Sequence, residues 1–182
     1  GASNFPAWEL CKGLWISDRL NLARFDCVQP RYNILFRMIE DELLPLCRDQ
    51  GVGVIAYNPL AGGFLTGRYE TGQEIEAGTR FSLGAGAGSL YQARYWQEAQ
   101  FQAVDEMKAF FSARNRSLTH IAIAWVLAQP GVTSAIVGAS RPEQLFDSLQ
   151  AVGQTLDDEE MAFANSIWYR LPRSDNPAVT RR

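Results

Sequence analysis

Short apolar runs alternate with helical segments along this chain, and that order constrains the possible folds more than any other feature. Residues 25–28, 52–56 and 133–137 each have the composition of a β-strand, and residues 1–4 look like the end of another. Helical patterns occur at residues 38–50, 91–113, 117–129, 141–152 and 157–171. Because strands joined through helices run parallel, we predict a parallel α/β sheet. The runs 52–56 and 133–137 are nearly continuous in apolar residues, which is typical of strands buried on both faces.

The number of βα units limits the architecture. No Gly-x-Gly-x-x-Gly pattern follows any of the strand-like runs, so the doubly wound dinucleotide-binding fold has no direct support. A (β/α)₈ barrel fits the alternation but needs roughly 250 residues, whereas this chain has 182. We therefore predict the C-terminal half of a (β/α)₈ TIM barrel with extra helices. Residues 1–182 would form a partial domain, from the end of strand 5 through strand 8 and the C-terminal helices, with the N-terminal half absent.

Half a barrel has an expected physical cost. It would leave two open strand edges and uncovered apolar faces. We therefore expect this chain by itself to be poorly soluble or to self-associate.

Composition excludes several classes of partner. The formal net charge is -3, so there is no broad electrostatic attraction to nucleic acid or to an anionic membrane. No uncharged apolar window reaches the length of about 18 residues that a membrane span requires. The three cysteines, Cys11, Cys27 and Cys47, are widely spaced and odd in number, which argues against a disulfide framework or a zinc site. This usage fits a reducing compartment, and we expect a cytoplasmic protein.

Polar or aromatic residues follow each predicted strand. In a barrel of this kind the functional residues lie at the carboxyl ends of the strands. A single polar residue there usually marks only the start of a loop, but four successive strand ends carry one. These ends are Ser3 with Asn4, Gln29, Tyr57 with Asn58, and residues 138–141.

The last of these ends, with the sequence VGASRPEQ, resembles a phosphate-binding turn. Small residues open a helix there, and free N–H groups together with the helix dipole favour an anion. Arg141 adds a forked donor suited to phosphate. The alternative is that Ser140 is a helix N-cap and Arg141 a solvated side chain, and spacing alone does not separate the two interpretations.

Four motifs, GASNF, VQPRYN, GVIAYNPLAGGFLTGRY and SAIVGASRPEQL, occur in an order that resembles the second half of the aldo-keto reductases. The likeness covers residues 1 to about 152, and the long third motif is highly specific. The sequence of this motif is especially similar to that of the family branches that include aflatoxin-aldehyde reductases and many bacterial reductases.

The resemblance implies a nicotinamide site at the first three strand ends. Tyr57 matches the aromatic residue that stacks on the nicotinamide ring, and a flat ring there leaves the other face of the cofactor open. Ser3, Asn4 and Gln29 match the groups that hydrogen-bond the carboxamide, for which donor–acceptor groups are well suited.

The loop after Tyr57 matches the segment along the pyrophosphate. There, glycine lets main-chain N–H groups approach phosphate oxygens. The matching loop residues are Asn58, Pro59, Leu60 and Gly62. Arg68 matches a basic residue near the phosphates, and Arg80 would also clamp the nucleotide.

The fourth strand end matches the segment that holds the adenosine 2′-phosphate, through Gly138, Ser140, Arg141 and Gln144. Arg141 favours NADP(H) over NAD(H). Asp147 and Ser148 stand where an acid and an asparagine often contact adenine. Asp147 keeps the charge with a shorter reach and Ser148 lacks an amide, so the details of adenine binding depart from the family pattern.

We assign no catalytic residue to this chain. The family's catalytic aspartate, tyrosine, lysine and histidine come from the first half of the barrel. The single histidine, His120, stands among apolar neighbours, which favours a packed or capping role. Both lysines, Lys12 and Lys108, lie in helical settings. The acidic run 157–160 fits the start of a helix better than a metal site, so we assign no metal.

The function predicted from these features is an NADP(H)-binding half of an oxidoreductase that reduces aldehydes or ketones to alcohols. Its partner would be a small carbonyl compound, with neither nucleic acid nor membrane involved, and the oligomeric state stays open. Two alternatives remain: a cofactor-sensing regulatory subunit like the potassium-channel β-subunits, and an inactive truncated fragment.

Overall fold

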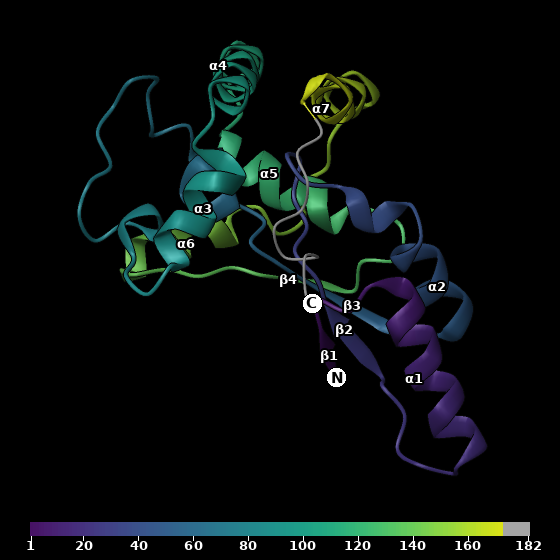
Figure 1. Cartoon of the computed structure of the whole chain (residues 1–182). Helices are drawn as coiled ribbons and strands as arrows, with labels where there is room; N and C mark the ends of the chain where they lie inside the picture. The colour runs from purple at the N-terminus through teal and green to yellow at the C-terminus, as the bar shows by residue number, and fades with distance from the viewer. Residues whose placement is uncertain (173–182) are drawn as a thin grey trace.

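The computed structural model describes residues 1–172 and contains one parallel sheet of four strands. The strands are β1 (Ala2–Ser3), β2 (Cys27–Gln29), β3 (Gly53–Tyr57) and β4 (Ser134–Ile136), in the spatial order β1-β2-β3-β4 (Figure 1). All three pairings are parallel, with Ser3 opposite Gln29 and Tyr57 opposite Ile136. The predicted parallel α/β sheet is thus confirmed, and its four carboxyl ends lie at one edge.

Helices account for most of the remaining regular structure. The α-helices are α1 (Ala7–Arg19), α2 (Leu43–Gln50), α3 (Ala87–Tyr95), α4 (Glu98–Ser112), α5 (Leu118–Leu127), α6 (Pro142–Leu149) and α7 (Asp158–Arg170). Short 3₁₀ segments are η1 (Met38–Glu40), η2 (Ala61–Thr66) and η3 (Arg80–Ser82). Figure 1 shows α1 and α2 side by side next to the sheet, with α3 and α6 on its far side. As the sequence indicated, α6 starts with Pro142 and α7 starts with acids, where the Asp157 carboxylate accepts from the Glu160 N–H at 2.8 Å.

Two predicted helices are each interrupted. The segment predicted at residues 38–50 divides into η1 and α2, because Pro45 lacks an N–H and is tolerated only in the first turn of a helix. The segment predicted at residues 91–113 divides into α3 and α4 at Trp96, whose backbone (φ -86°, ψ 57°) is not helical. Breaking the helix there lets the Trp96 side chain turn into an aromatic cluster.

That aromatic cluster fixes the long segment between β3 and α4. Phe64 and Phe81 approach the Trp96 ring with centroids 6.1 and 4.8 Å away, and Phe101 and Tyr69 lie 5.2 and 5.1 Å from it. Such edge-to-face packing adds roughly 0.5–1.5 kcal/mol per pair beyond area burial. The cluster therefore anchors residues that lie far from any strand. Trp8, by contrast, is 62% exposed on α1.

Neither strand predicted to be buried on both faces is so. In β3, Val54 and Ala56 are fully buried, whereas Ile55 and Tyr57 are only half-buried. In β4, Ile136 is 41% exposed. The reason is that β4 pairs only with β3 and lies at the edge of the four-stranded sheet, where fewer neighbours cover it.

None of the helices within residues 1–172 is long and apolar enough to cross a membrane. Residues 173–182 lie outside the described residues.

The cysteines offer a direct test of this packing. All three are free; Cys11 is exposed and Cys47 is buried, and burial raises the pKa of the Cys47 thiol to about 11. Because the thiolate is the reactive form, we expect a thiol reagent at about pH 8 to modify Cys11 rapidly and Cys47 only after unfolding in urea. Mass spectrometry of the labelled peptides would show this. Cys11→Ser should remove the fast phase, and equal labelling rates for Cys47 and Cys11 would contradict the fold.

Candidate functional site

A string of hydrogen bonds joins the carboxyl ends of β1, β2 and β3. The Tyr57 hydroxyl donates to Asn4 Oδ1 at 3.0 Å, and Asn4 Nδ2 donates to Ser3 Oγ at 3.1 Å. Ser3 Oγ in turn donates to the Gln29 carbonyl oxygen at 3.3 Å. The parallel register makes this possible, because it places Ser3 level with Gln29. The string therefore tethers the ring of Tyr57 at the sheet edge.

Buried amides hold the turn that follows Tyr57. Asn33 is fully buried, and its Nδ2 donates to the Asn58 carbonyl oxygen at 2.9 Å and to the Tyr95 hydroxyl at 3.1 Å. Asn58 Nδ2 donates to the same hydroxyl at 3.0 Å. Burial raises the pKa of Tyr95, so its hydroxyl stays protonated at neutral pH. Asn58 itself has φ 64°, a left-handed conformation that asparagine tolerates better than most residues.

Three N–H groups of this turn donate to acceptors within it. Gly62 N donates to Asn58 Oδ1 at 2.6 Å, Ala61 N to the Asn58 carbonyl at 3.0 Å, and Gly63 N to the Leu60 carbonyl at 2.8 Å. We predicted that glycine here presents main-chain N–H groups to a phosphate, and the structure corrects that reason. Gly62 and Gly63 have φ of 73° and 95°, so they serve the left-handed turn.

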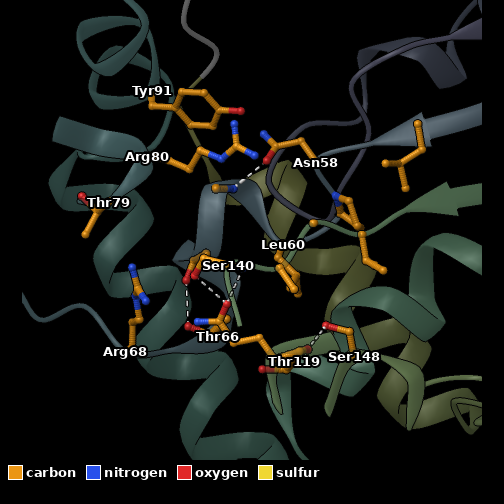
Figure 2. Close-up of a pocket in the computed structure, with 18 of the residues that line it drawn as sticks. Asn58, Leu60, Thr66, Arg68, Thr79, Arg80, Tyr91, Thr119, Ser140 and Ser148 are labelled. Carbon is orange, nitrogen blue, oxygen red and sulfur yellow. Dashed lines mark hydrogen bonds between the residues drawn. The ribbon is translucent and has the colours of Figure 1, made fainter. Parts of the chain in front are cut away.

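Gly62 also permits close packing by Tyr91. A Cβ at Gly62 would lie 2.8 Å from two ring carbons of Tyr91 and 3.6 Å from Arg80 Cβ. Figure 2 shows Tyr91 and Arg80 next to Asn58 on one side of the pocket. Helix α3, which carries Tyr91, therefore packs over the turn after β3.

These segments enclose a pocket of about 560 Å³ at the carboxyl edge of the sheet. Its lining includes these sequence-predicted residues: Tyr57, Asn58, Pro59, Leu60, Gly62, Arg68, Arg80, Gly138, Ser140, Gln144, Asp147 and Ser148. They come from β3, η2, η3, the turn after β4 and α6, which are far apart in the chain. The structure therefore brings most of the predicted site together in one place.

The remaining predicted residues are placed differently. Ser3, Asn4 and Gln29 do not line the pocket, but they reach it through the string that ends at Tyr57. Arg141 is exposed at the start of α6 and is not among the lining residues.

The structure of the turn before α6 shows that Ser140 is not the N-cap of that helix. The N-cap of α6 is Arg141, not Ser140. Ser140 instead donates from both its N–H (2.9 Å) and its hydroxyl (3.0 Å) to Oε1 of Gln144. Gln144 thus orders this turn, and Gly138 lies near Arg80, whose Nη2 would be 3.7 Å from a Cβ there.

Several lining residues escaped the sequence analysis. They are Thr66, Gly78, Thr79, Leu83, Tyr91, Thr119, Ile136 and Val137. Gly63 and Ala139, which also line the pocket, lie in two segments that the sequence had already indicated. No local pattern indicates Tyr91 or Thr119, because they enter from α3 and α5 through tertiary packing.

Two other features complete the picture of the site. Arg68 donates to the Tyr69 hydroxyl, and its guanidinium carbon lies 4.5 Å from that ring's centroid. His120, predicted to have apolar surroundings, instead lies with Nε2 2.8 Å from Oδ1 of Asp147. Within residues 1–172, no cluster of three or more His, Cys, Asp and Glu side chains could hold a metal ion.

Comparison with known proteins gives this arrangement a family. The family model "Aldo/keto reductase family" matches residues 1–168. The chain is 35% identical to an uncharacterized oxidoreductase, YrpG, of Bacillus subtilis (strain 168), over 92% of this chain and 48% of that protein. It is 33% identical to a probable voltage-gated potassium channel subunit beta of Oryza sativa subsp. japonica, over 84% of this chain and 46% of that protein.

A third relative carries an explicit activity in its name. The chain is 30% identical to an NADH-specific methylglyoxal reductase of Escherichia coli (strain K12), over 87% of this chain and 46% of that protein. The chain belongs to the aldo/keto reductase family. It spans about half of the length of the curated relatives it matches.

The contact between Gly62 and Tyr91 can be tested by a matched pair of substitutions. Gly62→Ala adds a Cβ against the Tyr91 ring at a positive φ, whereas Gly72→Ala adds one at a similar φ (80°) with no atom within 4 Å. We expect Gly72→Ala to lower the free energy of unfolding by about 1–2 kcal/mol from backbone strain alone. Gly62→Ala should cost a further 1–3 kcal/mol or so from overpacking. Urea denaturation measures both, and equal losses would contradict the close approach of Tyr91.

Proposed function

We propose that this chain forms the nicotinamide-nucleotide-binding half of an oxidoreductase that reduces aldehydes or ketones to alcohols with NADP(H). The observation that carries the proposal is the pocket that joins an aromatic strand end, Tyr57, to the ordered turn at Ser140 and α6. The family relationship supports it. The chain also matches about half of the length of a related oxidoreductase. The partial-barrel arrangement, from a fifth to an eighth strand, is part of the same proposal.

The residues present fit a nicotinamide dinucleotide. Tyr57 offers a flat ring held at its hydroxyl by Asn4, and a ring held this way is suited to stacking on another ring. Ser3, Asn4 and Gln29 lie at the same edge of the sheet, where an amide could exchange hydrogen bonds with their polar groups. A reduced nicotinamide bound there would supply a hydride to the carbonyl carbon of a substrate.

The middle of the pocket fits the phosphates. Arg68 and Arg80 both line it, and guanidinium groups bind phosphate oxygens with two parallel N–H donors. Because the N–H groups of Ala61, Gly62 and Gly63 are already partnered, these two side chains are the donors that we assign to the pyrophosphate. Leu60 and the glycines then shape the wall of the pocket beside it.

The far end of the pocket fits the adenosine part. Ser140 and Gln144 order the turn, and Arg141 follows at the start of α6, where it would reach a 2′-phosphate from the pocket rim. We therefore propose NADP(H), although one relative is named as NADH-specific. Asp147 and Ser148 would face the adenine.

We assign no catalytic acid, base or nucleophile within residues 1–172. The chain's own contribution is to bind and orient the dinucleotide at the carboxyl edge of the sheet. The proton that must reach the substrate oxygen as the carbonyl is reduced would come from a group elsewhere in the whole enzyme.

Direct binding tests the proposal. Titration with NADPH, followed by quenching of tryptophan fluorescence, should show saturable binding. Tyr57→Leu removes the stacking ring and should weaken binding by about tenfold or more, since ring stacking is worth roughly 1–3 kcal/mol. Tyr169→Leu is the matched control, because Tyr169 is 71% exposed on α7 and outside the pocket. The absence of NADPH binding to the unmodified chain would overturn the proposed function.

Selectivity between the two cofactors tests the role of Arg141. NADPH should bind about tenfold or more tightly than NADH, because a charge-assisted contact to the extra phosphate is worth roughly 1.5–3 kcal/mol. Arg141→Gln should weaken NADPH binding until the two affinities are about equal, and it should leave NADH binding unchanged. The control Arg19→Gln changes an exposed arginine on α1 and should preserve the ratio. Equal affinities for NADPH and NADH in the unmodified chain would show that this site does not bind the 2′-phosphate.

A further inference from the structure

His120 is the only histidine in the chain, and the proposed function does not use it. It lies on α5 directly after Thr119, which lines the pocket. Its side chain is only 17% exposed. A polar ring kept largely away from water needs hydrogen-bond partners, and here both of its nitrogens have one.

The two partners define which nitrogen carries the proton. Gln154 Nε2 lies 3.4 Å from His120 Nδ1 and also donates to the Gln150 carbonyl at 2.8 Å. That nitrogen belongs to an amide NH₂ group, which can only donate, so Nδ1 must accept. The proton of the neutral ring is then on Nε2, which donates to Asp147 Oδ1 across 2.8 Å.

This donation restrains a side chain that would otherwise be mobile. Asp147 lies on α6, and its side chain is 54% exposed at the rim of the pocket. An exposed aspartate ordinarily samples several rotamers. Because a carboxylate has two oxygens and about four acceptor sites, the bond from His120 occupies Oδ1 and leaves Oδ2 able to accept from a ligand.

We propose that His120 is a positioning residue that holds the Asp147 carboxylate ready to accept from an amino group on the purine of the bound dinucleotide. The inference rests on the proposed function. The Asp147 carboxylate would make the pocket selective between purines, because an ionised carboxylate can only accept hydrogen bonds. A 6-amino purine offers it a donor, whereas a 6-oxo purine places an acceptor oxygen against it.

The tautomer can be observed directly. With one histidine in the chain, selective ¹⁵N-histidine labelling gives one pair of ring nitrogen signals. For the neutral ring we expect the signals of the Nε2–H tautomer, because Nε2 faces the Asp147 carboxylate and Nδ1 faces the Gln154 amide N–H. A neutral ring protonated on Nδ1 would place a lone pair against the Asp147 carboxylate and would overturn the assignment.

Selectivity between two nucleotides tests the positioning role. The probes are NADPH and its hypoxanthine analogue, which carries a 6-oxo group in place of the amino group. The unmodified chain should bind NADPH about tenfold more tightly, as expected for a hydrogen bond to a charged group. His120→Phe should bring that ratio close to one, and His120→Gln, which can donate from a similar position, should restore most of it.

A second variant keeps the test decisive if His120→Phe disturbs folding. Asp147→Ala changes an exposed side chain on α6 and should lower the ratio to the same extent, with no further loss in the double variant. If the unmodified chain binds neither nucleotide, the proposed function fails. If it binds both but shows no preference, or if His120→Phe or Asp147→Ala keeps the preference, the inference about His120 is wrong and the proposed function stands.

Discussion

The hydrogen bonds of one fully buried side chain, Asn33, decide the shape of the candidate site. Its amide joins the segment after β2 to the Asn58 carbonyl and to the Tyr95 hydroxyl, while its Oδ1 accepts from the Leu35 N–H at 3.0 Å. A buried amide left without partners would cost roughly 1–3 kcal/mol per group, so the three segments are coupled. The left-handed turn at Asn58 and the position of α3 depend on this junction.

Given that junction, the pocket follows from parallel pairing. The strands bring their carboxyl ends to one edge, so residues between Tyr57 and Ser148 that are far apart in the chain line the same space. Tyr57 is tethered from one side by Asn4, and Tyr91 covers the turn at Gly62 from the other. The aromatic cluster around Trp96 keeps the intervening segment in place, which allows a long glycine-containing loop to contribute Arg80.

Much of the fold and site could be read from the sequence because the signals are local. Strand ends at Gln29 and Tyr57 follow directly from apolar runs, and the start of α6 follows from Pro142. Predictions were wrong where a neighbour overrides a local pattern. The helix break at Trp96 reflects the aromatic cluster, and the exposure of Ile136 reflects an edge strand with one partner. The role of Arg141 stays a prediction, and its position at the start of α6, outside the pocket lining, is set by the tertiary structure.

The sequence by itself determined the parallel α/β class, the polar character of each strand end, and the family to which those motifs belong. Only the tertiary structure decided what those residues touch. It paired His120 with Asp147, whereas the flanking apolar residues had indicated only a packed or capping role. It also used the N–H groups of Ala61 and Gly62 inside their own turn. The physical reason is that backbone geometry is set by a few adjacent residues, whereas hydrogen-bond partners and burial are set by segments that meet only when the chain is folded.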